Sequence, residues 1–190
     1  MCWTILLEFL RNPKRIGALT ASSRALSRRI VSSIDLSTAS VILEYGPGTG
    51  AFTSRILREK APGARLWAIE NNRRLAEKFR RRFPNVILFE ETAENAPDIV
   101  QDMGARKVDC VVSGLPWATF DAPLQDRLLD ATLEILREGG TFVTFAYLTG
   151  LMLRSGKRFR EKLTSCFSQV TTSPIVWWNL PPAFVYQCAR

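Results

Sequence analysis

The chain has 190 residues, 46% hydrophobic and 23% charged, which is typical of an ordinary soluble globular protein and excludes a disordered or fibrous one. With 26 Lys and Arg against 18 Asp and Glu, the formal charge is +8, which favours polyanionic partners, either nucleic acid or an anionic membrane surface. The absence of histidine excludes Ser-His and Cys-His catalysis, an imidazole base and histidine-bound metals, so we expect no metal, and the four scattered cysteines favour a reducing cytoplasm.

The first 35 residues are predicted to form an N-terminal helical cap. Residues 2–11 are expected to form a short apolar helix, followed by a basic segment at 11–15. A second, amphipathic helix is predicted between residues 20 and 34, because Leu26, Ile30 and Ile34 recur at a four-residue spacing. We expect neither a bilayer-spanning segment nor a secretory signal, since the apolar runs are short and Glu8 interrupts the first.

From residue 40 onward the pattern alternates between strands and helices. Strands are expected at 41–45, 66–69, 86–89, 108–112 and 141–147, and two more around 168–176 and 183–189. Residues Phe52, Ile56 and Leu57 give the first intervening helix its buried face, and Gly139-Gly140 is predicted to end the last one. Repeated βαβ units predict an α/β, Rossmann-like, mostly parallel seven-stranded sheet with helices on both faces and an antiparallel C-terminal strand. We expect a single domain over residues 1–190, with its core at 40–190.

A glycine loop follows the first strand directly. Residues Glu44 to Gly50 read Glu-Tyr-Gly-Pro-Gly-Thr-Gly. Glycine permits tight turns and lets a ligand lie against the backbone, and ligands of open parallel sheets bind beyond the carboxyl ends of the strands. Glu70 ends the second strand, 20 residues after Gly50, where a carboxylate can accept both hydroxyl protons of a ribose. A lone glycine turn is usually only a turn, but this combination indicates an adenosine-type cofactor.

The acid before the glycines distinguishes between cofactors. A dinucleotide loop needs G-x-G-x-x-G, so that the helix N-terminus can bind a pyrophosphate. This loop reads G-P-G-T-G after Glu44, and a glutamate there repels a pyrophosphate but suits a ligand that carries an amine and a sulfonium. The predicted cofactor is therefore S-adenosylmethionine.

The segment from Leu43 to Gly50 resembles the first motif of class I S-adenosylmethionine-dependent methyltransferases, and Glu70 matches their second-strand acid. The resemblance implies that the glycine loop borders the methionine part and the ribose, and that the stretch after the third strand borders the adenine. Relatives often carry Gly-Asp-Ala there, whereas this chain has Glu-Glu-Thr-Ala at residues 90–93. The implied cofactor-binding residues are Ser23, Glu44, Gly46, Gly48, Thr49, Gly50, Glu70, Asn71, Glu91, Thr92, Ala93 and Ser113.

The segment Ser-Gly-Leu-Pro-Trp at residues 113–117 follows the fourth strand. It is similar to the Asn/Asp-Pro-Pro-Tyr motif of enzymes that methylate amino nitrogens, in which oxygens hold the amine and an aromatic ring covers it. Trp is the best ring for contact with a developing cation, although a Pro-terminated strand with a core tryptophan is the other interpretation. The predicted catalytic residues are Ser113, Pro116, Trp117 and Tyr147, and the candidates for removing the amine proton are Tyr147, Tyr186, Asp121, a lipid phosphate and water.

Two families of amino-nitrogen methyltransferases compete for the substrate. Ribosomal RNA adenine dimethyltransferases share the glycine loop but normally carry a C-terminal helical RNA-binding domain, and nothing of that size follows residue 150 here. Bacterial phospholipid N-methyltransferases are short single domains, and residues 16–23 and 179–186 resemble their segments, with Ala21 in place of the usual proline. The favoured prediction is N-methylation of an amine-headed phospholipid or aminolipid of the phosphatidylethanolamine type. The alternatives are RNA adenine N6-methylation and a non-catalytic basic module that binds membrane or RNA.

Two segments combine apolar and basic residues in the manner of a membrane-contact surface. The first is the helix at 3–10 with the basic residues at 11–15, and the second is residues 151–160, interpreted as a mobile lid. We expect a cytoplasmic protein, peripheral to the inner face of the membrane. Under the RNA alternative, the basic helix at residues 73–82 grips phosphates instead.

Overall fold

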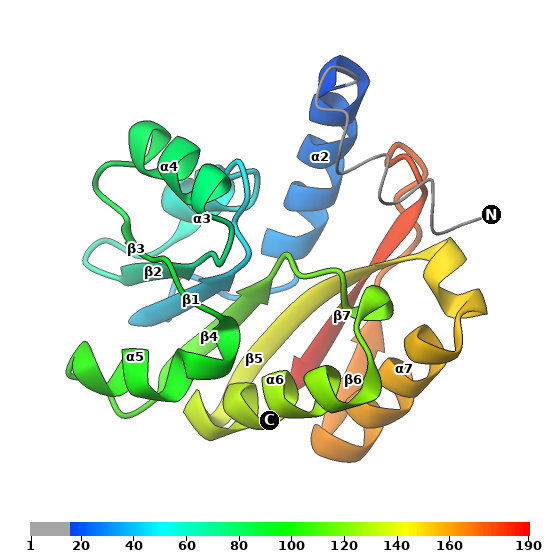
Figure 1. The fold of residues 1–190 in the computed structure, drawn as a ribbon. Coiled ribbons are helices and arrows are strands. Elements are labelled where there is room, and N and C mark those ends of the chain that lie inside the picture. The colour runs from blue at the N-terminus through cyan, green and yellow to red at the C-terminus, as the bar shows by residue number, and fades with distance from the viewer. Residues whose placement is uncertain (1–15) are drawn as a thin grey trace.

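The computed structural model describes the backbone of residues 16–190 and the side chains of residues 24–190. The predicted helix at 2–11, the basic segment at 11–15 and the side chain of Ser23 lie outside the described residues. Figure 1 shows the elements in chain order. They are α2 (Ile16–Val31), β1 (Val41–Tyr45), α3 (Thr53–Glu59), β2 (Arg65–Ile69), α4 (Arg73–Arg82), β3 (Ile87–Phe89), η2 (Ala93–Asn95), α5 (Ala96–Asp102), β4 (Val108–Ser113), η3 (Trp117–Thr119), α6 (Ala122–Ile135), β5 (Leu136–Tyr147), η4 (Leu148–Met152), α7 (Arg154–Cys166), β6 (Gln169–Thr172) and β7 (Ala183–Ala189).

The seven strands form one sheet in the order β3-β2-β1-β4-β5-β7-β6. Strand β1 pairs in parallel with both β2 and β4, and β7 runs antiparallel between β5 and β6. The predicted Rossmann-like sheet with an antiparallel C-terminal strand is confirmed. Because the chain order reverses between β1 and β4, a crevice is expected beyond their carboxyl ends.

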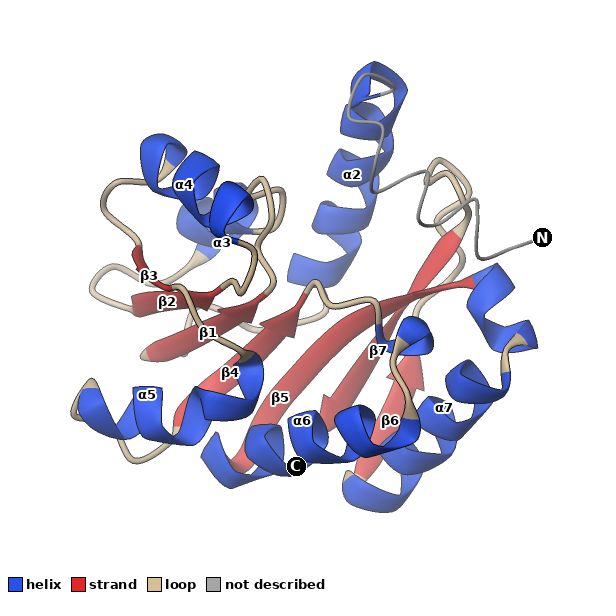
Figure 2. Ribbon diagram, in the orientation of Figure 1, coloured by secondary structure: helices blue, strands red, loops and turns tan. Residues whose placement is uncertain are grey.

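Helices cover both faces of the sheet, and Figure 2 shows α5, α6 and α7 on one side and α2, α3 and α4 on the other. Each face has its own hydrophobic cluster because successive side chains of a strand point to opposite faces. In β1, Leu43 and Tyr45 pack in the cluster under α5–α7, whereas Ile42 packs with Leu26 and Ile30 of α2. These two clusters fix the positions of the loops at the carboxyl edge.

Gly139 and Gly140 do not end a helix. Helix α6 ends at Ile135, and both glycines lie inside β5, where the pairing with β4 shifts register. Gly139 has φ +68°, and a Cβ at Gly140 would lie 2.8 Å from the Arg137 carbonyl oxygen. The glycines therefore serve a β-bulge. The prediction that Leu57 lies on the buried face of α3 is also wrong, because its side chain is 38% exposed.

The segment 151–160 differs from the predicted lid. It is the end of η4 and the start of α7, which is tied to η3 because the Ser155 hydroxyl donates to the Ala118 carbonyl at 2.6 Å. Gln125 of α6 donates to the Ser155 carbonyl at 3.1 Å. Phe159, expected at a membrane, is instead buried in the cluster under α5–α7. Phe159 is therefore not part of a membrane surface, but Met152, Arg154, Lys157 and Arg160 are exposed, and membrane contact by this segment stays a prediction.

Within residues 16–190, none of the helices combines the length and the apolar character needed to cross a bilayer. The same part of the chain also brings together no group of three or more metal-binding side chains.

Candidate functional site

The glycine loop is anchored to the two strands beside it. The amide of Gly46 donates to the Ile69 carbonyl at 2.8 Å, and the amide of Gly114, after β4, donates to the Tyr45 carbonyl at 2.7 Å. These bonds hold the loops after β1 and β4 against each other at the carboxyl edge of the sheet.

Two glycines of this loop have different surroundings. Gly50 has φ +80°, and a Cβ there would lie 2.0 Å from the Phe83 ring. Gly48 has φ +56°, but a Cβ there would meet nothing within 4 Å. Packing inside the protein thus accounts for the glycine at 50, whereas at 48 the backbone faces open space where a ligand can approach it.

Glu70 and Glu44 lie on either side of the glycine loop. The Glu70 carboxylate accepts hydrogen bonds from the amide of Gly48 at 3.1 Å and from the amide of Asn72 at 2.9 Å. The side chain of Glu44 is fully buried, and one of its oxygens accepts from the Thr53 hydroxyl at 2.7 Å. Its Oε1 has no hydrogen-bond partner among the described residues. Burial raises the pKa of Glu44 to about 7, although the Thr53 bonds oppose that shift.

The stretch after β3 holds itself together with local bonds. The Thr92 hydroxyl caps η2 by accepting from the Glu94 amide at 3.5 Å. The Glu91 carboxylate accepts from the Asn95 side chain at 3.1 Å, and Ala93 is buried. Asn71 is exposed after β2. The structure therefore places the predicted adenine-side residues Glu91, Thr92 and Ala93 beyond β3, at the same edge of the sheet where Asn71 follows β2.

Trp117 lies in the core and does not face open space. Its ring is 1% exposed and stacks on the Phe159 ring, with centroids 4.6 Å apart and an angle of 14°. Its Nε1 donates to the Ser113 Oγ at 2.9 Å. The structure therefore shows the core interpretation of this tryptophan, with the ring packed inside the protein. Pro116 accepts from the Thr119 amide at 2.8 Å and opens η3.

A cavity of about 1170 Å³ lies beside the glycine loop, bounded by α2, α3, the end of β5 and the residues before β7. Of the predicted residues, Gly46, Thr49 and Tyr147 line it, together with Gly114. The side chains of Glu70, Ser113 and Trp117 do not. The cavity therefore extends from the α2 side of the loop, whereas Glu70 and the residues after β3 lie on the other side.

The cavity wall is both cationic and apolar. Its arginines are Arg24, Arg28, Arg55, Arg58 and Arg82, and its large apolar residues are Leu26, Phe52, Leu57, Phe83, Phe145 and Leu180. Among the side chains of residues 24–190, no acidic one lines it. Arg55 pairs with Glu59 of its own helix, and Arg82 donates to the Thr49 carbonyl at 2.8 Å. Neither Arg24 nor Arg28 forms an ion pair with another described side chain. Both remain available to an anion.

Sequence reasoning missed these arginines. A signal existed, because Arg24 and Arg28 are four residues apart and Arg55 and Arg58 are three apart, so each pair shares a helix face. The sequence did not reveal that these two faces meet at one cavity.

Three side chains were predicted as candidates for removing the amine proton, and one of them lies at this cavity. Tyr147 lines it, and burial raises the pKa of its hydroxyl. Tyr186 is instead buried in the core beside Phe159, and Asp121 caps α6 by accepting from the Leu124 amide at 3.0 Å. Of these three side chains predicted as candidates for removing the amine proton, Tyr147 is the one that lines the cavity.

Comparisons with known proteins agree with this architecture. Residues 42–140 match the methyltransferase domain family. The chain is 32% identical over 184 residues to an ornithine lipid N-methyltransferase of Singulisphaera acidiphila, covering 95% of this chain and 92% of that protein. It is 34% identical over 120 residues to a ribosomal RNA small subunit methyltransferase A of Parasynechococcus marenigrum, but this covers 61% of the chain and 38% of that protein.

Among solved structures, an O-methyltransferase from Bacillus cereus in complex with SAH superposes with a TM-score of 0.68 at 14% identity, over 88% of this chain and 80% of that one. At that identity the likeness concerns the fold. The sequence matches, the strand order and the glycine loop between β1 and α3 lead to one assignment. The chain belongs to the class I S-adenosylmethionine-dependent methyltransferases.

Proposed function

We propose that this enzyme N-methylates an amine-headed lipid, either a phospholipid of the phosphatidylethanolamine type or an ornithine-type aminolipid. The similarity to an ornithine lipid N-methyltransferase over 95% of the chain carries the proposal. A lipid substrate also requires the protein to work at a bilayer surface, and we propose the inner face of the membrane, with the enzyme bound peripherally.

The residues around the glycine loop fit the cofactor. S-adenosylmethionine supplies an electrophilic methyl group on a sulfonium and carries an ammonium group. The unpartnered, buried Oε1 of Glu44 suits that ammonium, because a buried acceptor left without a donor is costly. The open side of Gly48 gives a ligand access to the backbone, and the carboxylate of the adjacent Glu70 suits ribose hydroxyls. Contacts from Ser23, Asn71, Glu91, Thr92 and Ala93 remain predictions.

The cavity fits the rest of the substrate. An amine-headed lipid carries a phosphate or carboxylate a few bonds from its amine, and guanidinium groups bind such anions with paired hydrogen bonds. Arg24 and Arg28 offer those groups, while Phe145, Leu26 and Leu180 offer an apolar wall for the chain that follows. Arginines and apolar side chains lining one cavity match an amphiphile better than a wholly polar ligand.

Tyr147 is proposed to orient the acceptor nitrogen. Methyl transfer forms a nitrogen–carbon bond as the carbon–sulfur bond breaks, so an acceptor that arrives as an ammonium ion must first lose a proton to expose its lone pair. A tyrosine hydroxyl is ordinarily neutral near pH 7, and burial raises the pKa of Tyr147 further in that direction. A neutral hydroxyl accepts a hydrogen bond from the amine and positions its lone pair, and the proton leaves to water or to the lipid phosphate. Orientation and exclusion of water are then the main contributions of the protein.

RNA adenine methylation is the second candidate. It is favoured by the partial matches to ribosomal RNA methyltransferases and by the basic residues of α4, whose exposed members include Arg74 and Arg81. RNA phosphates would suit the arginines equally well. A sugar-phosphate backbone, however, offers no apolar chain to contact the apolar residues of the cavity wall.

The test is methyl transfer from labelled S-adenosylmethionine to vesicles that contain the aminolipid, with structured RNA in a parallel reaction. We expect lipid-extractable label, reduced in an Arg24→Gln/Arg28→Gln variant and unchanged in Arg106→Gln, an exposed arginine away from the cavity lining. Label that enters RNA while the lipid stays unlabelled would overturn the proposal.

A further inference from the structure

Three large apolar side chains are exposed on one short segment between β6 and β7. Trp177 is 68% exposed, Trp178 85% and Leu180 66%. We call residues 177–180 the tryptophan tip. Neighbouring exposed apolar side chains mark a contact surface, because scattered single ones are ordinary but a cluster of large ones is not.

The tip is a fixed turn with its polar part inward. The amide of Val176 donates to the Ala183 carbonyl at 2.7 Å, which closes the neck, and the Asn179 amide donates to the Val176 carbonyl at 3.1 Å. The Asn179 side chain is buried and donates to the Pro181 carbonyl at 2.7 Å. Because Val176 packs in the cluster under α2, the turn is anchored while both indole rings are largely exposed.

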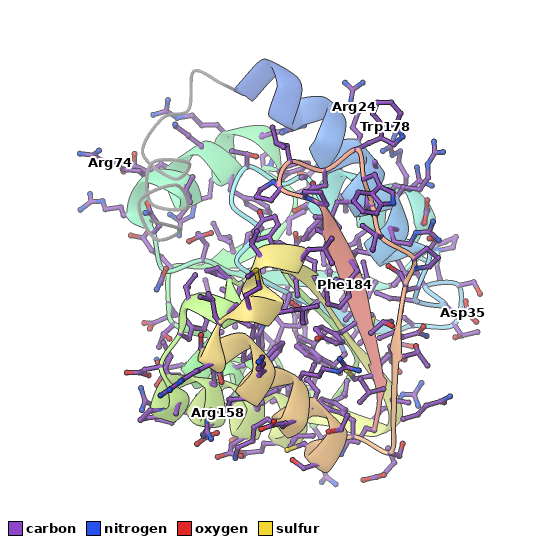
Figure 3. The ribbon with its side chains drawn as sticks, turned by 90° about the vertical axis from the view of Figure 1, so that its right-hand side faces the viewer. Arg24, Asp35, Arg74, Arg158, Trp178 and Phe184 are labelled. Atoms are coloured by element: carbon purple, nitrogen blue, oxygen red, sulfur yellow. The ribbon has the colours of Figure 1, made fainter. Side chains whose placement is uncertain are left out.

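The tip lies at the rim of the arginine-lined cavity. Asn179 and Leu180 line that cavity together with Arg24 and Arg28 of α2. Figure 3 shows Trp178 and Arg24 at the same end of the molecule. Exposed indole rings, an aliphatic side chain and cations without an ion-pair partner in the described part of the chain therefore gather at the mouth of one cavity.

We propose that the tryptophan tip, with Arg24 and Arg28, docks on the surface of an anionic bilayer, so that a lipid passes into the cavity beside Leu180. Indole rings prefer the headgroup level of a bilayer, where an apolar body and a polar N–H are both accommodated. Arginines beside them meet lipid phosphates. This inference deepens the proposed function and rests on it, since it takes the substrate to be a bilayer lipid.

A nucleic acid is the competing partner, because bases also stack on exposed aromatic rings. Such stacking would use the two indoles but leave Leu180 and the cavity-lining, exposed Leu57 without a role. The observations therefore favour the bilayer, and RNA becomes an outcome of the test.

The first measurement is sedimentation with vesicles of phosphatidylglycerol and phosphatidylcholine. The test variant is Trp177→Ser/Trp178→Ser, and the control is Ile87→Ser on β3 at the far edge of the sheet, where the side chain is also exposed. We expect the partition coefficient to fall about tenfold or more in the double variant, given the apolar area of two indoles. The control should stay close to wild type. Equal binding by the double variant and wild type, or no binding by wild type, overturns the inference.

The second measurement is tryptophan fluorescence in a Trp3→Phe background. Trp67 and Trp117 are buried, so quenching by brominated lipids would come from the two tip residues. We expect quenching that disappears in the double variant. Quenching by RNA but not by brominated vesicles would overturn the inference in favour of a nucleic acid.

A short-chain aminolipid, used below its critical micelle concentration, separates this inference from the proposed function. We expect the double variant to methylate the monomeric lipid like wild type and to lose most of its activity on vesicles. If the double variant is as active as wild type on both forms, the docking surface is wrong while the function stands. If wild type methylates neither form, the proposed function fails, and the vesicle binding and quenching still decide the docking surface.

Discussion

The buried carboxyl of Glu44 should give the free enzyme an unusual dependence of stability on pH. Its pKa is raised by burial from an ordinary value of 4.5 to about 7. Because the folded-state pKa lies above the unfolded one, the folded protein holds the proton more tightly. The stabilising contribution is fully present below pH 4.5 and is lost as the pH rises toward about 7. A shift of this size corresponds to about 3 kcal/mol.

A Glu44→Gln variant isolates this effect. Glutamine keeps a group that can accept from the Thr53 hydroxyl but does not titrate, so the variant should lack the loss of stability between about pH 5 and pH 7. Urea unfolding of both proteins across that range measures the difference, and the free energies of unfolding should diverge by a few kcal/mol. A wild-type slope no steeper than that of the variant would refute the reasoning.

The same carboxyl links protons to cofactor binding. If the ammonium of S-adenosylmethionine meets Glu44, binding favours the ionised carboxylate and releases a proton near pH 6 to 7. Calorimetry in buffers of different ionisation enthalpy detects that release. Glu44→Gln should bind more weakly and release no proton; proton release that persists in the variant would exclude Glu44 as its source.

Three further predictions concern the glycine loop, the buried tryptophan Trp117 and the cavity. Gly50→Ala should destabilise the fold by about 1–3 kcal/mol in urea unfolding, because its positive φ and the Phe83 ring both oppose a side chain, and Phe83→Ala should relieve part of the loss. Trp117→Ala should lower the free energy of unfolding by about 3–5 kcal/mol, as expected for a large core residue. An unchanged free energy of unfolding with a selective loss of activity would instead support the prediction that this ring covers the substrate amine. Tyr147→Phe should lower kcat about tenfold or more while the Kd for S-adenosylmethionine from calorimetry stays unchanged, and an unaltered kcat would remove Tyr147 from the site.

The part of the site on one continuous segment was predictable from sequence. Strand β1, the glycine loop and α3 follow one another, so the apolar run, the glycines and Glu44 predict both the local structure and the class of ligand. Glu70 was predictable for a similar reason, since parallel strands bring their carboxyl ends to the same edge.

The errors arise where distant segments decide the outcome. Gly139 and Gly140 look like a helix stop locally, but the register between β4 and β5 uses them as a bulge. The ring of Trp117 is turned inward by Phe159 from α7, a helix that the sequence pattern did not predict. The arginine cavity likewise depends on how α2 and α3 pack together, which the spacing of arginines on each helix cannot specify.

Mass spectrometry of headgroups tests the central claim most directly. The enzyme is incubated with a deuterated methyl donor and vesicles that hold phosphatidylethanolamine, an ornithine lipid and phosphatidylglycerol, alongside small-subunit ribosomal RNA. The account predicts deuterated methyl groups on the nitrogen of an amine-headed lipid and none on phosphatidylglycerol or RNA. Methyl groups on adenine with every lipid unmodified would contradict it.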